Sequence, residues 1–164
     1  MATITRITAN FAVASALSAA DLAHIAALGF RTVINNRLDN EERSQPETAL
    51  MRSATESHGL AYVHVPVSKL EIFTDPVVSA MADAIGSAPG PILAHCASGT
   101  RSAIVWAAAR ARSQSVDDIL AVLSAAGLEL GFLRDDLDSQ ADRARWAGAP
   151  AVAVDASDNQ GRAA

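Results

Sequence analysis

The stretch Pro91-Ile92-Leu93-Ala94-His95-Cys96-Ala97-Ser98-Gly99-Thr100-Arg101-Ser102 decides both the fold and the candidate chemistry of this chain. Residues 91–95 are an apolar run short enough for a central strand of a parallel sheet. The segment from residue 102 to about residue 113 is rich in alanine, which favours a helix. A strand, a short loop and a helix in this order place Cys96 at the carboxyl end of a strand. Open α/β sheets bind their ligands at that edge.

Cys96 is the candidate nucleophile of this loop. A helix N-terminus stabilises an anion, and the thiolate is the reactive form of cysteine. Backbone N–H groups that curl around one centre can bind an anion, and a glycine supplies the positive φ that such a curl needs. The predicted anion-binding loop consists of Ala97, Ser98, Gly99, Thr100 and Arg101.

Three side chains beside the thiol have predicted supporting roles. Arg101 can bind an oxyanion with its planar, two-pronged guanidinium group. Ser102 either stabilises the thiolate through its hydroxyl or caps the following helix, and one residue can do both. His95 is expected to support the loop by hydrogen bonding rather than to act as a base.

Two further candidates follow neighbouring predicted strands. Asp75 is the one well-placed general acid, although Thr74-Asp75-Pro76 also reads as a helix start with Asp75 as its N-cap, which is the preferred interpretation. The polar segment at residues 35–42 predicts a solvated loop. Because this loop follows a strand, it could carry Arg37 to the rim of the pocket.

Strands alternate with helices on both sides of the cysteine loop. Strands are expected at residues 11–14, 30–35, 60–67 and 91–95, and helices at about 18–29, 46–58, 75–85, 102–113, 115–127 and 133–146. This alternation predicts an α/β fold with a central, mostly parallel sheet and helices on both faces. We expect a single domain over residues 1–146 and a flexible C-terminal tail over residues 147–164.

Composition limits the partners of this chain. Its 164 residues carry a net charge of −5, with a pI near 5.2, so no basic surface is expected to hold nucleic acid or an anionic membrane. No apolar run approaches the roughly 20 residues of a membrane-spanning helix. The N-terminus lacks the apolar core of a secretion signal, and Cys96 is the only cysteine, so no intramolecular disulfide can form. We therefore expect a cytoplasmic protein.

No metal or other cofactor is expected. His24, His58 and His64 lack the spacing of metal ligands, and no second cysteine accompanies them. The expected partners are a small anionic sulfur donor or a phosphate ester, together with an external thiol acceptor. The sequence predicts no oligomeric state.

Several motifs together resemble one bacterial family. They are Val33-Ile34-Asn35-Asn36-Arg37 with Glu41-Glu42 and Gln45-Pro46, then Val65-Pro66-Val67, then the cysteine loop. Over about residues 11–138 the chain resembles the phosphatase-like domain of the beta-lactamase-hydrolase-like proteins. That family is similar in fold to dual-specificity tyrosine phosphatases, and some members are fused to a persulfide dioxygenase-like domain. The resemblance implies a tyrosine phosphatase-like fold and cysteine-dependent chemistry.

The loop departs from the tyrosine phosphatase pattern in its length. Four residues separate Cys96 from Arg101, whereas tyrosine phosphatases have five between these two residues. The spacing instead satisfies the rhodanese-type pattern Cys-x-x-Gly-x-Arg, although rhodaneses often have arginine where this chain has Ala97. A shorter loop closes a smaller ring of N–H groups, which suits a terminal sulfur on cysteine better than a phosphate.

Three functions therefore stay open. The first is a sulfurtransferase, in which Cys96 takes sulfane sulfur from a persulfide or thiosulfate donor and passes it to an external thiol. The second is a phosphatase, in which Cys96 forms a phosphocysteine, Arg101 binds the phosphoryl oxygens and Asp75 donates a proton. The third is a non-catalytic anion-binding module. Loop length favours the first, which is the preferred hypothesis, and fold resemblance favours the second.

Overall fold

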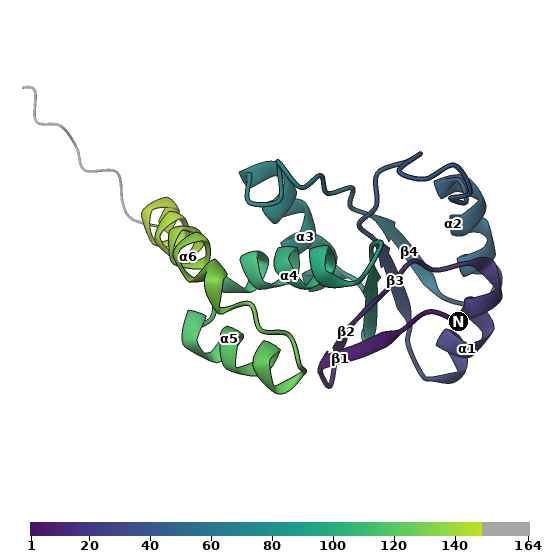
Figure 1. The fold of residues 1–164 in the computed structure, drawn as a ribbon, viewed down its shortest axis with the longest axis horizontal. Helices are drawn as coiled ribbons and strands as arrows, with labels where there is room; N and C mark the ends of the chain where they lie inside the picture. The colour runs from purple at the N-terminus through teal and green to yellow at the C-terminus, as the bar shows by residue number, and fades with distance from the viewer. Residues whose placement is uncertain (149–164) are drawn as a thin grey trace, which may run out of the picture.

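The computed structural model describes residues 1–148, and its elements alternate between strands and helices (Figure 1). The strands are β1 (Ile4–Thr8), β2 (Phe11–Ala14), β3 (Thr32–Asn35), β4 (Ala61–His64) and β5 (Ile92–His95). The helices are α1 (Leu22–Ala27), α2 (Thr48–Ser57), α3 (Asp75–Ser87), α4 (Thr100–Ala111), α5 (Val116–Ala125) and α6 (Arg134–Gly148), with short 3-10 turns at Ala19–Asp21 and Gly131–Leu133. This order confirms the predicted α/β class.

The five strands form one sheet in the order β1-β2-β5-β3-β4. β2, β5, β3 and β4 are parallel, and β1 pairs antiparallel with β2 at one edge, so the predicted mostly parallel sheet is confirmed. β5 is the central strand, and its last residue, His95, pairs with Ala14 on one side and Asn35 on the other. Cys96 therefore leaves the sheet between two strand ends.

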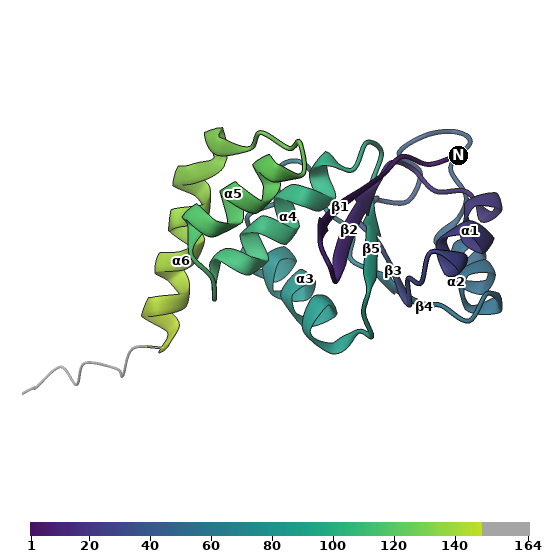
Figure 2. The same ribbon diagram turned by 90° about the horizontal axis from the view of Figure 1, so that it is seen from below.

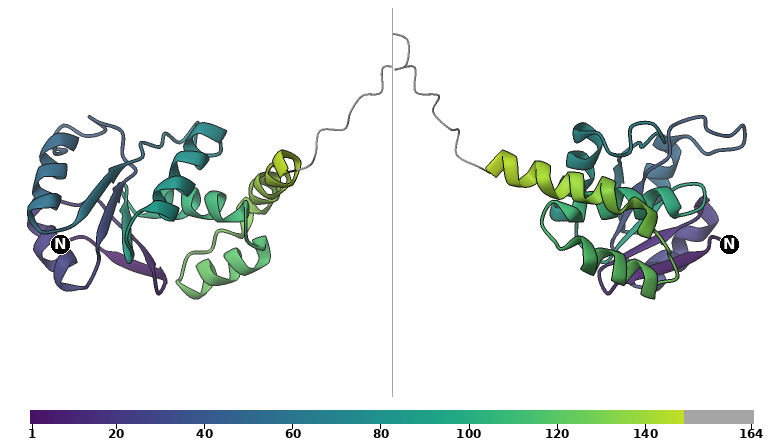
Figure 3. Two further views of the ribbon diagram at one scale, coloured as in Figure 1. Left: turned by 180° about the vertical axis from the view of Figure 1, so that it is seen from behind. Right: turned by 60° about the vertical axis from the view of Figure 1, so that its left-hand side comes forward.

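Helices cover both faces of the sheet, as predicted (Figure 2). Side chains alternate along a strand, so Ile92 and Ala94 of β5 face one layer and Leu93 faces the other. The first layer contains α3, α4, α5 and α6, and the second contains α1 and α2. α6 packs on α4 and α5 at the end of the molecule farthest from α1 and α2 (Figure 3).

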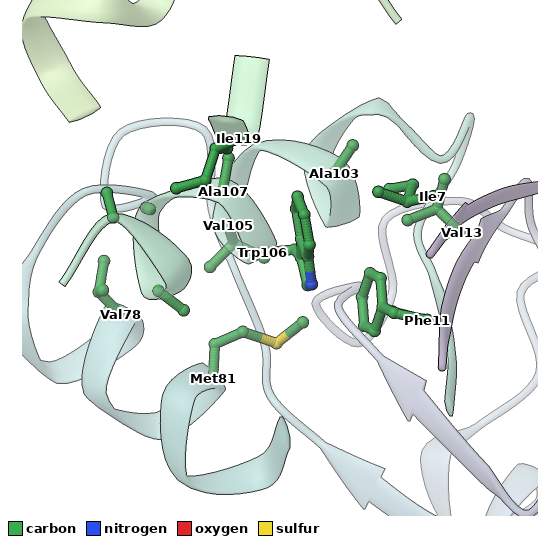
Figure 4. Packing of buried hydrophobic residues seen from close by; sticks show 14 of the residues in the cluster. Ile7, Phe11, Val13, Val78, Met81, Ala103, Val105, Trp106, Ala107 and Ile119 are labelled. Carbon is green, nitrogen blue, oxygen red and sulfur yellow. The ribbon is translucent and has the colours of Figure 1, made fainter. Parts of the chain in front are cut away.

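The larger hydrophobic core fixes α4 against the sheet. Trp106 of α4 is 2% exposed and stacks on Phe11 of β2, with 5.5 Å between the ring centroids (Figure 4). Met81 of α3 lies in the same cluster. Alanines at buried positions of α4 allow neighbouring elements to approach closely. Because this packing immobilises α4, it also fixes the cysteine loop at its N-terminus.

The structure differs from the sequence predictions at several element ends. β1 was not predicted, α4 begins two residues earlier than expected, and the last helix extends to Gly148. The part of the predicted flexible tail at residues 149–164 lies outside the described residues. Over residues 1–148, no helix combines the length and apolar character needed to cross a bilayer.

Candidate active site

The cysteine loop is tied by its backbone to the strands on either side of β5. The Cys96 amide donates to the Ala14 carbonyl (3.4 Å), and the Ala16 amide donates to the Ala97 carbonyl (3.1 Å). On the β3 side, the Asn36 amide donates to the carbonyl of His95 (2.8 Å). The start of the loop is therefore held from both sides, which limits how far the thiol can move.

Gly99 turns the loop into the helix. Its φ of +93° lies in the left-handed region, and it is the N-cap residue of α4. In this conformation its amide donates to the Sγ atom of Cys96 over 3.1 Å. A Cβ at this position would also lie 3.4 Å from the Ala14 backbone. The positive φ expected of this glycine is confirmed, and it aims an N–H group at the sulfur.

Four further amides of the loop are available to an anion, whereas that of Thr100 is not. The Thr100 amide donates to the Ser98 hydroxyl over 3.4 Å. The amides of Ala97, Ser98, Arg101 and Ser102 have no acceptor among residues 1–148. Unpaired N–H groups at the start of a helix form a favourable environment for negative charge.

A pocket of about 480 Å³ opens onto the thiol. Its walls come from the loop between β4 and α3, the cysteine loop and α4, and the lining residues are Lys69, Ile72, Phe73, Cys96, Ala97, Ser98, Thr100, Arg101 and Ile104. Cys96 itself is only 1% exposed. Among the described residues, no carboxylate and no imidazole lines this pocket. Nor do residues 1–148 contain a cluster of three or more His, Cys, Asp or Glu side chains that could hold a metal ion.

Arg101 lines the pocket, but its guanidinium group is engaged with Glu41. Nη1 donates to Oε1 of Glu41, and Nη2 donates to Oε2 over 3.2 Å. Nη1 also donates to the carbonyls of Val67 (3.1 Å) and Asn36 (3.3 Å). Arg101 therefore ties the segments that follow β3 and β4 to α4. An oxyanion bound by Arg101 would compete with the Glu41 carboxylate.

Glu41 is held by two arginines. Oε2 accepts from Nε of Arg37 over 3.2 Å, and Oε1 accepts from the Leu38 amide over 2.9 Å. Burial alone would raise the pKa of Glu41, but hydrogen bonds from Arg101, Leu38 and Arg37 outweigh it and lower that pKa to about 2. The same pairing raises the pKa of Arg101. Arg37 is 4% exposed behind Glu41, so the expectation that it reaches the rim of the thiol pocket is wrong.

His95 and Ser102 are buried beside the loop without side-chain partners. The ring nitrogens of His95 have no direct hydrogen-bond partner among residues 1–148, while its backbone carbonyl accepts from Asn36, so the supporting role of its side chain stays a prediction. Burial, with the charge of Arg37 adding to it, lowers the pKa of His95 to about 4. Ser102 is the third residue of α4, and because Gly99 is the N-cap, the capping role is wrong for Ser102. Its hydroxyl is unpaired, and its role toward the thiolate stays a prediction.

The structure does not bring Asp75 to the thiol pocket. Asp75 is the first residue of α3, and Thr74 is the N-cap, one residue before the predicted position. Its carboxylate pairs with Arg112 (2.9 Å) and Arg143 (3.1 Å), at the junction of α3, α4 and α6. It is 66% exposed and is not among the pocket-lining residues.

Sequence reasoning missed Lys69 as a pocket residue and Glu41 as the partner of Arg101. Lys69 is the only lysine of the chain, which is a signal that the sequence offered. Glu41 follows Arg37 by four residues, but its bond to Arg101 spans 60 positions, so no local pattern indicates it.

Comparison with known proteins relates this site to a family. Residues 3–113 match the model for the beta-lactamase hydrolase-like protein, phosphatase-like domain. A beta-lactamase hydrolase-like protein of Xylella fastidiosa (strain 9a5c) is 36% identical over 115 residues, which cover 69% of this chain and 26% of that protein. A protein of the same name from Agrobacterium fabrum is 35% identical over 101 residues, or 62% of this chain and 23% of the relative. The chain thus spans about a quarter of these curated relatives.

Solved structures agree with this relationship. A protein from Neisseria meningitidis Z2491, named as a candidate phosphatase, is 35% identical with a TM-score of 0.72, and the match covers 84% of this chain and 97% of that one. Human DUSP28 shares the fold at 21% identity and a TM-score of 0.53, covering 88% and 93% of the two chains. The predicted tyrosine phosphatase-like fold is confirmed. The chain belongs to the family of phosphatase-like domains found in beta-lactamase hydrolase-like proteins.

Proposed function

We propose that this phosphatase-like domain is a cysteine-dependent sulfurtransferase that moves sulfane sulfur through a persulfide on Cys96. One observation carries the proposal: among residues 1–148, no carboxylic acid and no imidazole, the usual donors of a proton to a leaving oxygen, lines the thiol pocket. Asp75, the candidate acid from sequence, is instead paired with Arg112 and Arg143.

The lack of a carboxylic acid or imidazole matters because the two reactions release different leaving groups. Hydrolysis of a phosphate monoester releases an alkoxide or phenolate, which needs a proton from a positioned group. Sulfur transfer from a persulfide releases a thiolate, which is a weaker base than either and can leave unprotonated. A pocket lined by no carboxylic acid and no imidazole is therefore better suited to sulfur transfer.

The proposed reaction has two displacement steps. The Cys96 thiolate attacks the outer sulfur of a persulfide RS–SH, the S–S bond breaks, and its electron pair leaves with RS⁻. The outer sulfur, with its proton, is then bonded to Cys96 as Cys96–S–SH. An external thiolate attacks this outer sulfur, the second S–S bond breaks, and Cys96 returns to the thiolate. No oxidant or reductant is consumed, because each step exchanges one S–S bond for another.

The loop offers support for the outer sulfur of this intermediate. A persulfide anion carries its charge one atom beyond Sγ, where the unpaired amides of the loop are candidate donors. The Gly99 amide already donates to Sγ. The four-residue spacing between Cys96 and Arg101 favours a smaller anion than a phosphoryl group, as argued from the sequence.

A phosphatase is the second candidate, and the family and structural comparisons favour it. In that mechanism Cys96 forms a phosphocysteine, and Arg101 leaves Glu41 to bind the phosphoryl oxygens. The proton for the leaving oxygen would have to come from solvent, from the Lys69 ammonium group or from a group outside the described pocket lining.

Parallel turnover assays separate the candidates. Wild type and Cys96→Ser would be tested with an organic persulfide plus a thiol acceptor, with thiosulfate plus the same acceptor, and with an aryl phosphate. Ser113→Ala, outside the pocket, serves as the control for handling and folding. We expect persulfide formation on the acceptor that depends on Cys96, with little phosphate release. Cys96-dependent phosphate release without sulfur transfer would make the domain a phosphatase, and inactivity toward all substrates would favour an anion-binding module.

A further inference from the structure

Resting on the proposed sulfur transfer, we infer that Lys69 selects the sulfur donor: an organic persulfide that carries its own carboxylate, set back from the reacting sulfur. Lys69 lies in the loop between β4 and α3, and it lines the same pocket as Cys96. Three features of this pocket lead to the inference: the charge that is available, the apolar wall and the size.

Lys69 supplies the available positive charge of the pocket. Only two charged side chains, Lys69 and Arg101, line it among the described residues. The charge of Arg101 is balanced by Glu41, which accepts from both of its terminal nitrogens. Lys69 is exposed and has no ion pair or hydrogen bond through its side chain within residues 1–148. An anionic group of a bound molecule would therefore find its counter-charge at Lys69.

The rest of the wall is suited to an organic molecule. Ile72 and Phe73, from the same loop as Lys69, and Ile104 from α4 give the pocket apolar side chains. A volume of about 480 Å³ lies in the range of sites for small organic ligands, and it greatly exceeds the needs of an inorganic anion of a few atoms. Apolar contacts contribute to binding only when the donor has a hydrocarbon part.

These features assign separate places to the parts of the donor. The outer sulfur must reach Sγ of Cys96, where the Gly99 amide and the unpaired loop amides lie. The carboxylate pairs with Lys69, and the carbon chain contacts Ile72 and Phe73. Thiosulfate places its charge directly beside the reacting sulfur and has no apolar part, so it cannot use either feature.

The test compares a persulfide with its uncharged amide. The probes are the persulfide of N-acetylcysteine, the persulfide of N-acetylcysteine amide, and thiosulfate. The proteins are wild type, Lys69→Gln, and Arg31→Gln, which removes one exposed positive charge at the opposite end of the sheet. For each protein, kcat/KM for transfer to one thiol acceptor gives the preference for acid over amide.

We expect kcat/KM of wild type and of Arg31→Gln to be about fivefold higher for the persulfide of N-acetylcysteine than for that of its amide, because an exposed ion pair contributes about this much. Lys69→Gln should show no preference between the two. The preference of wild type should also shrink as salt is added, since screening weakens a pair of exposed charges. Equal kcat/KM for acid and amide in wild type, or a preference that survives in Lys69→Gln, would overturn the role of Lys69 while leaving sulfur transfer intact. Failure of wild type to transfer sulfur from any of the three probes would overturn the proposed function, and this inference with it.

Discussion

Replacing Glu41 with Gln tests how strongly its carboxylate holds the candidate site together. That carboxylate accepts from Arg101 and Arg37, whose side chains are 13% and 4% exposed. Glutamine keeps the size and one oxygen acceptor, but it removes the negative charge. The largely buried guanidinium group of Arg101 then lacks a counter-charge, and that of Arg37 keeps only the exposed Glu42, 3.5 Å away. An uncompensated charge is costly in a protein interior. We therefore expect a lower free energy of unfolding.

The magnitude follows from the pKa of Glu41. The lowering from 4.5 to about 2 corresponds to at most about 3.5 kcal/mol, since each pKa unit is about 1.4 kcal/mol. The Glu41 side chain is 17% exposed, so water screens part of this interaction, and we expect a loss of about 2 kcal/mol at pH 7. A folded-state pKa below the unfolded value adds stability that is complete above pH 4.5 and disappears as pH falls toward 2.

Urea unfolding followed by tryptophan fluorescence measures this loss. The midpoint of Glu41→Gln should fall by about 1 M at pH 7, and the gap to wild type should shrink to less than about half at pH 3. Glu56→Gln, which removes an exposed partner 4.0 Å from Arg52, is the matched control and should shift the midpoint little. Equal midpoints for Glu41→Gln and wild type at pH 7, or a gap that persists unchanged at pH 3, would refute the reasoning.

Three further predictions concern the surroundings of the thiol. Gly99→Ala places a side chain on a residue with a φ of +93°, so it should lower the free energy of unfolding by about 1–2 kcal/mol and the rate of sulfur transfer at least about tenfold. An unchanged transfer rate would show that the left-handed conformation of Gly99 is unimportant for the reaction. By NMR titration, the ring of His95 should stay neutral down to about pH 4 because of its burial, and titration near pH 6.5 would contradict this. Gln140→Ala removes a donor to the Phe73 carbonyl (2.9 Å) and an acceptor of Arg112, so thermal unfolding should show a loss of about 2 kcal/mol and KM should rise; a KM equal to that of wild type would argue against a role in holding this wall.

The cysteine loop was predictable because its signals are local. An apolar run, a cysteine, a glycine and an alanine-rich segment lie next to one another in the sequence, and each has a direct physical meaning there. The left-handed φ of Gly99 followed from the need to turn from strand to helix. Even the start of α4 differed by only two residues, because Gly99 rather than Ser102 is its N-cap.

β1 was missed because its signal is weak. Its five residues mix polar and apolar side chains, and only Ile7 of the strand is buried. A strand of this kind at the edge of a sheet depends on its partner, here β2, rather than on its own pattern.

The partners of the charged side chains could not be predicted from local sequence. Arg101 lies 60 residues from Glu41, and Asp75 lies 68 residues from Arg143. Each pairing depends on which strands are neighbours and on how α6 packs against α4. For this reason the sequence identified the thiol and its loop, yet it misjudged the positions of Asp75 and Arg37.

Intact-protein mass spectrometry after exposure to an organic persulfide tests the central claim most directly. The account predicts that wild type gains one sulfur atom on Cys96, that added thiol removes it, and that Cys96→Ser gains none. A parallel sample exposed to an aryl phosphate should show neither a phosphoryl group on Cys96 nor release of phosphate. A phosphocysteine on Cys96 or Cys96-dependent phosphate release, with no sulfur gained from the persulfide, would contradict the account and identify the domain as a phosphatase.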